Sequence, residues 1–484
     1  MRDEIEAPEA PAAPQPKLKP ANENPWYVLM TLYGDDHERN RLVWNAWAGQ
    51  ALTVGERNAL VEKGMASALD VENLHALQQK ITATFKSEFA RRNVAKSDIP
   101  ELPNPNHPVR LAKIYVEEEV NLSGRIFPRG LHLSNVRFGK NFFAEFSSFE
   151  EVCSASKVEF EGKVSFFGAE FGSDSNFSCF FKREVTFEYS RFKGQVTFKS
   201  TFGGDADFRK GKFVDEVNFL DAVFEGSSNF NAANFSGRVK FSGVSFGRPS
   251  SSQPNSPSFR DCQFQHPTSF HQAVFWNAYP DFSGAILHDK TTFTARRTPT
   301  ESEVKSSSSL KGALYWPDHT QQDPESVRET CSTIRHILAK QGLPEDEHFF
   351  FRREMHFAGK IGSLWQRLPY LLFGLFSEYG YSILRPTLWL LGVWALGFAA
   401  FWGYLSGCCV PAPDTVIERP MGSAMALSFS NLFPLFGFGR VYFGAEFMMR
   451  LPAVLKTLAG LQTVASLPLL FFLGLGLRQR FRLR

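Results

Sequence analysis

Large apolar residues recur along the middle of the chain at intervals that fit neither a helix nor a simple strand. Between residues 202 and 246 the next phenylalanine comes alternately six and five residues later, which makes a repeat of eleven. A helix spaces its apolar positions by three and four residues, and a half-buried strand spaces them by two. We therefore predict a repeat architecture with one ring per unit in a common core. The predicted core phenylalanines are Phe202, Phe208, Phe213, Phe219, Phe224, Phe230, Phe235, Phe241 and Phe246.

The residues around each ring fit a narrow solenoid. Two positions before the ring the side chain is small or β-branched, as in Ala206 and Val217, and can fill the space beside an inward ring. The residue just before the ring is mostly polar or small, as Asp207 is, which is typical of an outward or turn position. The same register continues more weakly from Phe138 to Phe293.

Some of these units resemble the pentapeptide-repeat family, which reads Ala-(Asp/Asn)-(Leu/Phe)-X-X. The chain has "ADF" at 206–208 and "ANF" at 233–235, and the resemblance covers roughly residues 118–295. It implies a right-handed, four-sided β-helix with about one unit per face. The chain departs from the family by one extra residue in every second unit, which we interpret as a small bulge per pair of faces. The Pro/Ser-rich stretch 247–258 predicts a loop between coils.

Composition divides the rest of this 484-residue chain into further segments. We expect residues 1–24, rich in Pro, Ala, Glu and Lys, to be a disordered tail. Helical spacing predicts a small helical domain over 25–115, before a solenoid over 116–300 and a linker over 301–322. Two helices over 323–362 form a hairpin that either packs on the last coil or couples the solenoid to the segment that follows.

Two uncharged runs near the C-terminus, 387–405 and 457–477, are each long enough to cross a bilayer as a helix. They predict a membrane domain over 363–484, with an interfacial helix at 364–381 before the first span. Basic residues flank the two runs on their outer sides, which predicts both termini in the cytoplasm. The N-terminus shows no hydrophobic secretory segment, so we expect the part of the chain before the spans to remain in the cytoplasm. The expected location is the bacterial inner membrane.

The loop 406–456 between these runs contains an apolar stretch, 421–440, that ends in a Gly-Phe-Gly sequence. Its place resembles that of the filter in two-span potassium-channel pore domains, where backbone carbonyls of Thr-Val-Gly-(Tyr/Phe)-Gly hold the ion. Leu435 and Phe436 stand where Thr and Val are expected, and Arg440 stands where an acidic residue is common. The stretch is either a re-entrant or interfacial helix without a potassium filter, or it lines a gated pore, which requires a homo-oligomer such as a tetramer. The resemblance places Leu435, Phe436, Gly437, Phe438 and Gly439 at the filter positions.

Other polar and sulfur residues of this region are few. Gln462 lies within the second uncharged run, so it should face protein or a pore and not lipid. Cys408 and Cys409 follow the first run, and they either bond between subunits or are buried as small residues. The six cysteines of the chain show no metal-site spacing, so we expect no metal and no cofactor.

The sequence favours a binding protein over an enzyme. It has no nucleophile elbow, no phosphate loop and no paired carboxylates in a recognisable frame, so we expect no catalytic residues. The solenoid segment carries nearly equal numbers of acidic and basic residues, which disfavours the DNA mimicry of some pentapeptide-repeat proteins and any nucleic-acid partner. Two hypotheses stay open: a membrane-anchored interaction scaffold or sensor with an unknown protein partner, or a gated ion channel with the solenoid as regulatory domain.

Overall fold

The computed structural model describes residues 18–62, 74–94, 98–248, 255–295, 315–317, 320–407, 420–434, 437–438, 442–444, 447, 449 and 451–481. The chain divides into two compact units, residues 1–350 and 351–484, and each is described by itself.

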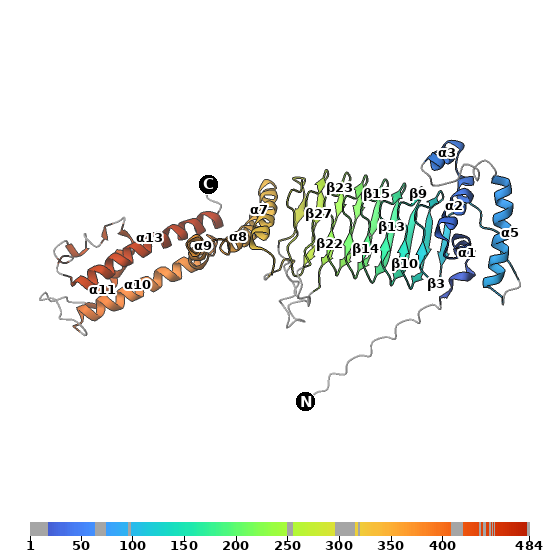
Figure 1. The fold of residues 1–484 in the computed structure, drawn as a ribbon. Coiled ribbons are helices and arrows are strands. Elements are labelled where there is room, and N and C mark those ends of the chain that lie inside the picture. Colours follow the sequence, from blue (N-terminus) through green and yellow to red (C-terminus); the bar gives the residue numbers. More distant parts are fainter. Residues whose placement is uncertain are drawn as a thin grey trace, which may run out of the picture. The chain divides into compact units, whose positions relative to one another are not determined.

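The first unit is built on a β-solenoid of short strands stacked in three sheets (Figure 1). The largest sheet holds β1 (Lys19–Pro20), β2 (Val109–Ala112), β3 (Ile114–Val116), β6 (Leu131–Ser134), β7 (Arg137–Phe138), β10 (Cys153–Phe160), β13 (Ser175–Phe181), β16 (Val196–Phe198), β17 (Thr201–Phe202), β20 (Val217–Asn218), β21 (Val223–Phe224), β24 (Val239–Lys240), β25 (Ser245–Phe246), β27 (Thr268–Phe270), β28 (Val274–Phe275) and β29 (Thr292–Phe293). The second holds β4 (Val120–Asn121), β8 (Phe142–Phe143), β11 (Val164–Ser165), β14 (Val185–Thr186), β18 (Ala206–Asp207) and β22 (Ser228–Asn229). The third holds β5 (Ile126–Phe127), β9 (Ser148–Phe149), β12 (Glu170–Phe171), β15 (Arg191–Phe192), β19 (Lys212–Phe213), β23 (Asn234–Phe235) and β26 (Gln263–Phe264).

The strands pair in parallel, and the pairing brings phenylalanine over phenylalanine along the solenoid. Phe202 pairs with Phe224, which pairs with Phe246 in the next coil. The rings of Phe202 and Phe224 stack with centroids 4.6 Å apart and planes 4° from parallel. All nine predicted phenylalanines between 202 and 246 are at most 2% exposed. The solenoid predicted from the ring spacing is therefore confirmed, with stacked phenylalanines as its core.

The alternating six- and five-residue spacing comes from two kinds of corner, whereas we had expected bulges in the strands. The five-residue intervals contain a tight turn with one residue at positive φ, and this residue recurs at Lys210, Asp221, Ala232 and Gly243. The six-residue intervals contain a bend instead. The strand pairs of 201–246 stay in register, so the extra residue belongs to the bend. The bend can accommodate the extra residue more readily than a strand can, because a bulge in a two-residue strand would disrupt the whole strand pair.

The described helices at the N-terminal end of the solenoid are α1 (Pro25–Met30), α2 (His37–Ala48), α3 (Val54–Glu62) and α5 (Leu74–Arg92), together with the short 3-10 turns Ala21–Glu23 and Gly49–Ala51. Helices α1 and α2 pack on the first strands, and α5 packs on α1 and α2. Trp44 of α2 donates from Nε1 to the carbonyl of Ile126 at 2.7 Å, and its ring lies 5.3 Å from that of Phe127 in the first coil. These helices therefore close the open end that a solenoid otherwise presents.

Two boundaries at this end differ from our expectation. Residues Lys19–Glu23 lie within the predicted disordered tail, yet β1 pairs with β3 and the amide of Lys19 donates to the carbonyl of Lys113 at 2.9 Å. The edge strand β3 offers unpaired backbone groups, and Pro20 fits there because an edge strand does not need its missing N–H. The parallel strands also begin at Val109, before the expected residue 116.

Aromatic residues and helix α7 (Pro324–Lys340) cover the other end of the solenoid. Trp316, expected in a linker, is 2% exposed and stacks on Phe275 at 4.6 Å. Helix α7 begins at the N-cap Asp323, and Thr330 donates to the carbonyl of Pro280 at 2.8 Å. Helix α8 (Pro344–Ala358) follows, and its Phe350 meets the Trp316 ring edge-on.

The second unit consists of helices (Figure 1). Helices α10 (Leu384–Leu405) and α13 (Ala453–Phe481) are both long and apolar enough to cross a membrane. The short helix α11 (Pro420–Leu432) packs against both of them. Helix α9 (Leu364–Ser377) precedes them and leaves Leu364, Trp365 and Leu371 mostly exposed.

Candidate functional sites

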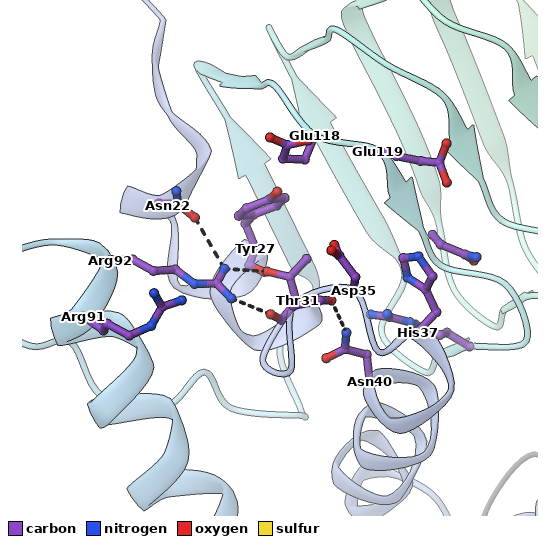
Figure 2. A pocket seen from close by; sticks show the side chains of 13 residues that line it. Asn22, Tyr27, Thr31, Asp35, His37, Asn40, Arg91, Arg92, Glu118 and Glu119 are labelled. Carbon is purple, nitrogen blue, oxygen red and sulfur yellow. Dashed lines mark hydrogen bonds between the residues drawn. The ribbon is translucent and has the colours of Figure 1, made fainter.

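A cavity of about 380 Å³ lies where the N-terminal helices meet the first coils of the solenoid, and we call it the cap pocket (Figure 2). Its lining comes from α1 and the turn after it, from α2, from the end of α5 and from the first coils. These elements supply Asn22, Tyr27, Thr31, Gly34, Asp35, His37, Asn40, Arg91, Arg92, Glu118, Glu119, Asn121 and Arg125.

One wall of the cap pocket is fixed by Arg92 at the C-terminal end of α5. Its guanidinium pairs with Glu88 at 2.7 Å and donates to the hydroxyl and the carbonyl of Thr31. Hydrogen bonds from Arg91 and Arg92 hold the pKa of the Glu88 carboxyl down, at about 2. Both arginines therefore share one carboxylate, and Arg92 anchors α5 to the end of α1.

The opposite wall of the cap pocket is acidic. Figure 2 shows Glu118 and Glu119 of the solenoid across from Arg91 and Arg92, with Tyr27 between them. Glu118 pairs with Lys140 of the next coil at 2.6 Å, and its side chain is 70% exposed. Burial raises the pKa of Tyr27, so its hydroxyl stays protonated at neutral pH.

The inner side of the cap pocket holds an arginine that is almost fully buried. Arg125 is 1% exposed and donates from Nη1 to the carbonyl of Met30 at 2.7 Å. Its guanidinium also lies 5.9 Å from the centre of the Trp44 ring. Burial, with the nearby charge of Arg41, lowers the pKa of Arg125 to about 9, which leaves it charged at pH 7. Arg125 cannot be singled out from the sequence, because nothing in the adjacent sequence marks it as different from other arginines.

A second polar site lies inside the helical unit around Gln462 of α13. Gln462 is 3% exposed and donates from Nε2 to the carbonyl of Val393 and to the hydroxyl of Ser428, both at 2.9 Å. Its Oε1 accepts from Nδ2 of Asn431 at 3.0 Å. Ser428 in turn donates to the carbonyl of Trp394 at 2.7 Å. All polar atoms of the Gln462 amide thus bond to α10 and α11 of the same chain.

The segment that resembles a potassium filter is only partly described. Leu435, Phe436 and Gly439 lie outside the described residues, as do Cys408 and Cys409. Gly437 has φ of +64°, and no described residue lies within 4 Å of its missing Cβ. The ring of Phe438 stacks on that of Tyr442.

The thiols and the metal-binding residue types form no further site in the described part of the chain. Cys153, Cys179, Cys262 and Cys331 are buried, and burial raises the pKa of Cys153 to about 12. No group of three or more His, Cys, Asp or Glu side chains among the described residues is arranged to hold a metal ion.

Comparison with known proteins gives no relative from which a function could be transferred. No family model, no curated protein and no solved structure matches this chain.

Proposed function

We propose that this protein is a membrane-anchored β-solenoid that serves as a cytoplasmic interaction scaffold or sensor, without a catalytic centre. In this proposal α10 and α13 span the bacterial inner membrane with both termini inside, and the solenoid is right-handed and four-sided. Helices cover one end and Trp316 with α7 covers the other, so the flanks and the cap pocket are among the surfaces open to partners.

The observation that carries the anchoring role is the hydrogen bonding of Gln462. A polar side chain in a membrane helix that faced a pore would be hydrated, whereas one in a self-contained bundle must bond to protein. Gln462 bonds to α10 and α11 of its own chain. This arrangement supports an anchor that is complete in one subunit.

A gated ion channel is the second candidate, and the helix order favours it. A long helix, a short helix packed against both neighbours, and a second long helix form the layout of a two-span pore subunit. A two-span subunit cannot enclose a pathway alone, so this function requires a symmetric ring, most simply of four chains.

One experiment separates the two functions. The full-length protein is reconstituted into nanodiscs for native mass spectrometry and into vesicles for potassium-flux measurement. We expect a monomer or dimer without flux. A tetramer with a potassium current that Gly437→Ala abolishes would overturn the scaffold proposal in favour of the channel.

A further inference from the structure

Arg125 has an unusual environment for a buried cation. A buried charge is strongly unfavourable unless it is paired and hydrogen-bonded. Arg125 makes one hydrogen bond, to the carbonyl of Met30, and its Nε has no partner among the described residues. The ring face of Trp44 supplies a weak electrostatic contact, but no carboxylate of the described residues pairs with this guanidinium. The positive charge lines the cap pocket and has no anionic partner in the part of the chain that the structure describes.

The other cations that line the cap pocket already have anionic partners. Arg91 and Arg92 both bond to Glu88. An anionic group that enters the pocket would therefore find its strongest unmet attraction at Arg125. Guanidinium groups bind carboxylates well because several N–H donors lie in one plane.

The outer part of the cap pocket selects against simple anions. Glu118 and Glu119 form one wall, and the exposed Asp35 adds a third carboxylate. Glu118 also pairs with Lys140, but both side chains of this ion pair are exposed, so it is weak and leaves Glu118 able to attract a second cation. These carboxylates would repel a dianion such as phosphate and would attract an ammonium group. A ligand with its positive group at the mouth of the pocket and its negative group inside would therefore complement both parts of the lining.

We propose that the cap pocket binds a small zwitterion of the amino-acid type, with its carboxylate on the Arg125 guanidinium and its ammonium group facing Glu118 and Glu119. The cavity of about 380 Å³ lies within the usual size range of small-molecule sites. The pocket joins the helical cap to the solenoid, so a ligand there links the two. This inference names the ligand of the sensor and rests on that part of the proposed function.

The test uses the full-length protein in detergent micelles and isothermal titration with each standard amino acid. Acetate, methylammonium and inorganic phosphate serve as partial ligands. We expect at least one amino acid to bind at least tenfold more tightly than acetate or methylammonium, and to raise the melting temperature. Binding by no amino acid, or equally tight binding of phosphate, would overturn the proposal.

Substitutions of Glu118 and Glu119 test the ammonium contact without changing any residue of the helical cap. The double variant Glu118→Gln and Glu119→Gln should weaken amino-acid binding at least tenfold, with little effect on acetate. Glu184→Gln is the matched control, because Glu184 also forms an exposed ion pair with a lysine of a neighbouring coil but does not line the pocket. An unchanged affinity in the double variant would reject the proposed ammonium contact.

Substitution of Arg125 tests the carboxylate contact. Arg125→Met should abolish binding, and Arg125→Lys should retain part of it. Circular dichroism and the melting temperature show whether the cap stays folded. Unchanged binding in a folded Arg125→Met variant would refute the site. Binding in micelles depends on neither a tetramer nor a pore, so an unexpected result of the mass-spectrometry or flux measurement leaves this result intact.

Discussion

Gly397 of α10 lies directly against the amide of Gln462 on α13. A Cβ atom at position 397 would come within 1.8 Å of Gln462 Nε2 and 2.4 Å of its Cδ. The Gln462 amide cannot move away without cost, because Val393, Ser428 and Asn431 hold it by hydrogen bonds. The close approach of the two long helices therefore depends on a glycine and an amide together.

We predict that Gly397→Ala destabilises the helical unit. Displacing the Gln462 amide leaves buried polar groups unpaired, at about 1–3 kcal/mol for each group. The melting temperature of the protein in detergent should fall. Gly392→Ala in the same helix is the matched control, since no described atom beyond the adjacent turns of that helix lies within 4 Å of the missing Cβ there. An equal effect of the two substitutions would contradict the packing role of Gly397.

Phe219→Ala should destabilise the solenoid by about 3–5 kcal/mol, the usual cost of removing a buried ring. The Phe219 ring is fully buried between those of Phe198 and Phe241, each 4.9 Å away. Denaturant unfolding followed by circular dichroism measures the loss. Phe146→Ala provides the comparison, because Phe146 is 61% exposed and should cost far less. A Phe219→Asp variant as stable as the parent would exclude this register.

The buried thiols of the solenoid should be unreactive in the folded protein. Burial raises the pKa of Cys153 and of Cys262 to about 12, so little thiolate forms at pH 8. Iodoacetamide labelling with peptide mapping should modify both residues only after denaturation. Rapid labelling of Cys153 in the native protein at pH 8 would contradict its burial.

The same thiols give stability a definite pH dependence. Their folded-state pKa lies above the unfolded value of about 8.5, so the folded protein binds the thiol proton more tightly. Their contribution is fully present below about pH 8.5 and is lost as the pH rises toward 12. Unfolding by denaturant at pH 7 and pH 10 should show lower stability at pH 10. Cys153→Ala tests the contribution of this thiol, because it removes the titrating group. Cys153→Ser is a poorer choice because it places a hydroxyl in the same buried position.

Helix α9 should lie at the membrane surface. Its 14 residues are too few to cross a bilayer, yet Leu364 and Trp365 are 80% and 82% exposed. A spin label at position 365 in nanodiscs should be more accessible to oxygen than to a water-soluble nickel complex. A label at the exposed Lys360 should show the opposite preference. Equal nickel access at both positions would argue against lipid contact.

The sequence predicted those parts of the structure that depend on regular spacing or on uniform composition. The phenylalanine intervals predicted the solenoid because every ring occupies the same core position, and the uncharged runs predicted the helices α10 and α13. Pairings between distant segments could not be predicted in this way. β1 lies against β3 only because the solenoid edge is exposed there. The bonds of Gln462 similarly depend on where α11 packs.

The cap pocket shows why a binding site is harder to predict than the fold around it. Arg125 contacts Met30, a residue 95 positions earlier in the chain, and most of the other lining residues come from the helical cap and not from the solenoid. A run of three glutamates at 117–119 was the only local signal, and charge runs of that kind are common on protein surfaces. The buried and unpaired state of Arg125 appears only when the cap is placed on the solenoid.

The parallel stacking of the strands has a mechanical consequence. The longest path through the largest sheet crosses ten strands, from β1 to β29, and at about 4.8 Å per strand spacing it extends roughly 43 Å. Both ends are held by packed caps, and the rings between them are stacked without gaps. Such a rod is stiff along its length, because shortening it would compress every backbone hydrogen bond at once. A ligand at the cap pocket would therefore act on the far end by moving the rod as one body, and the number of coils would set the distance over which it acts.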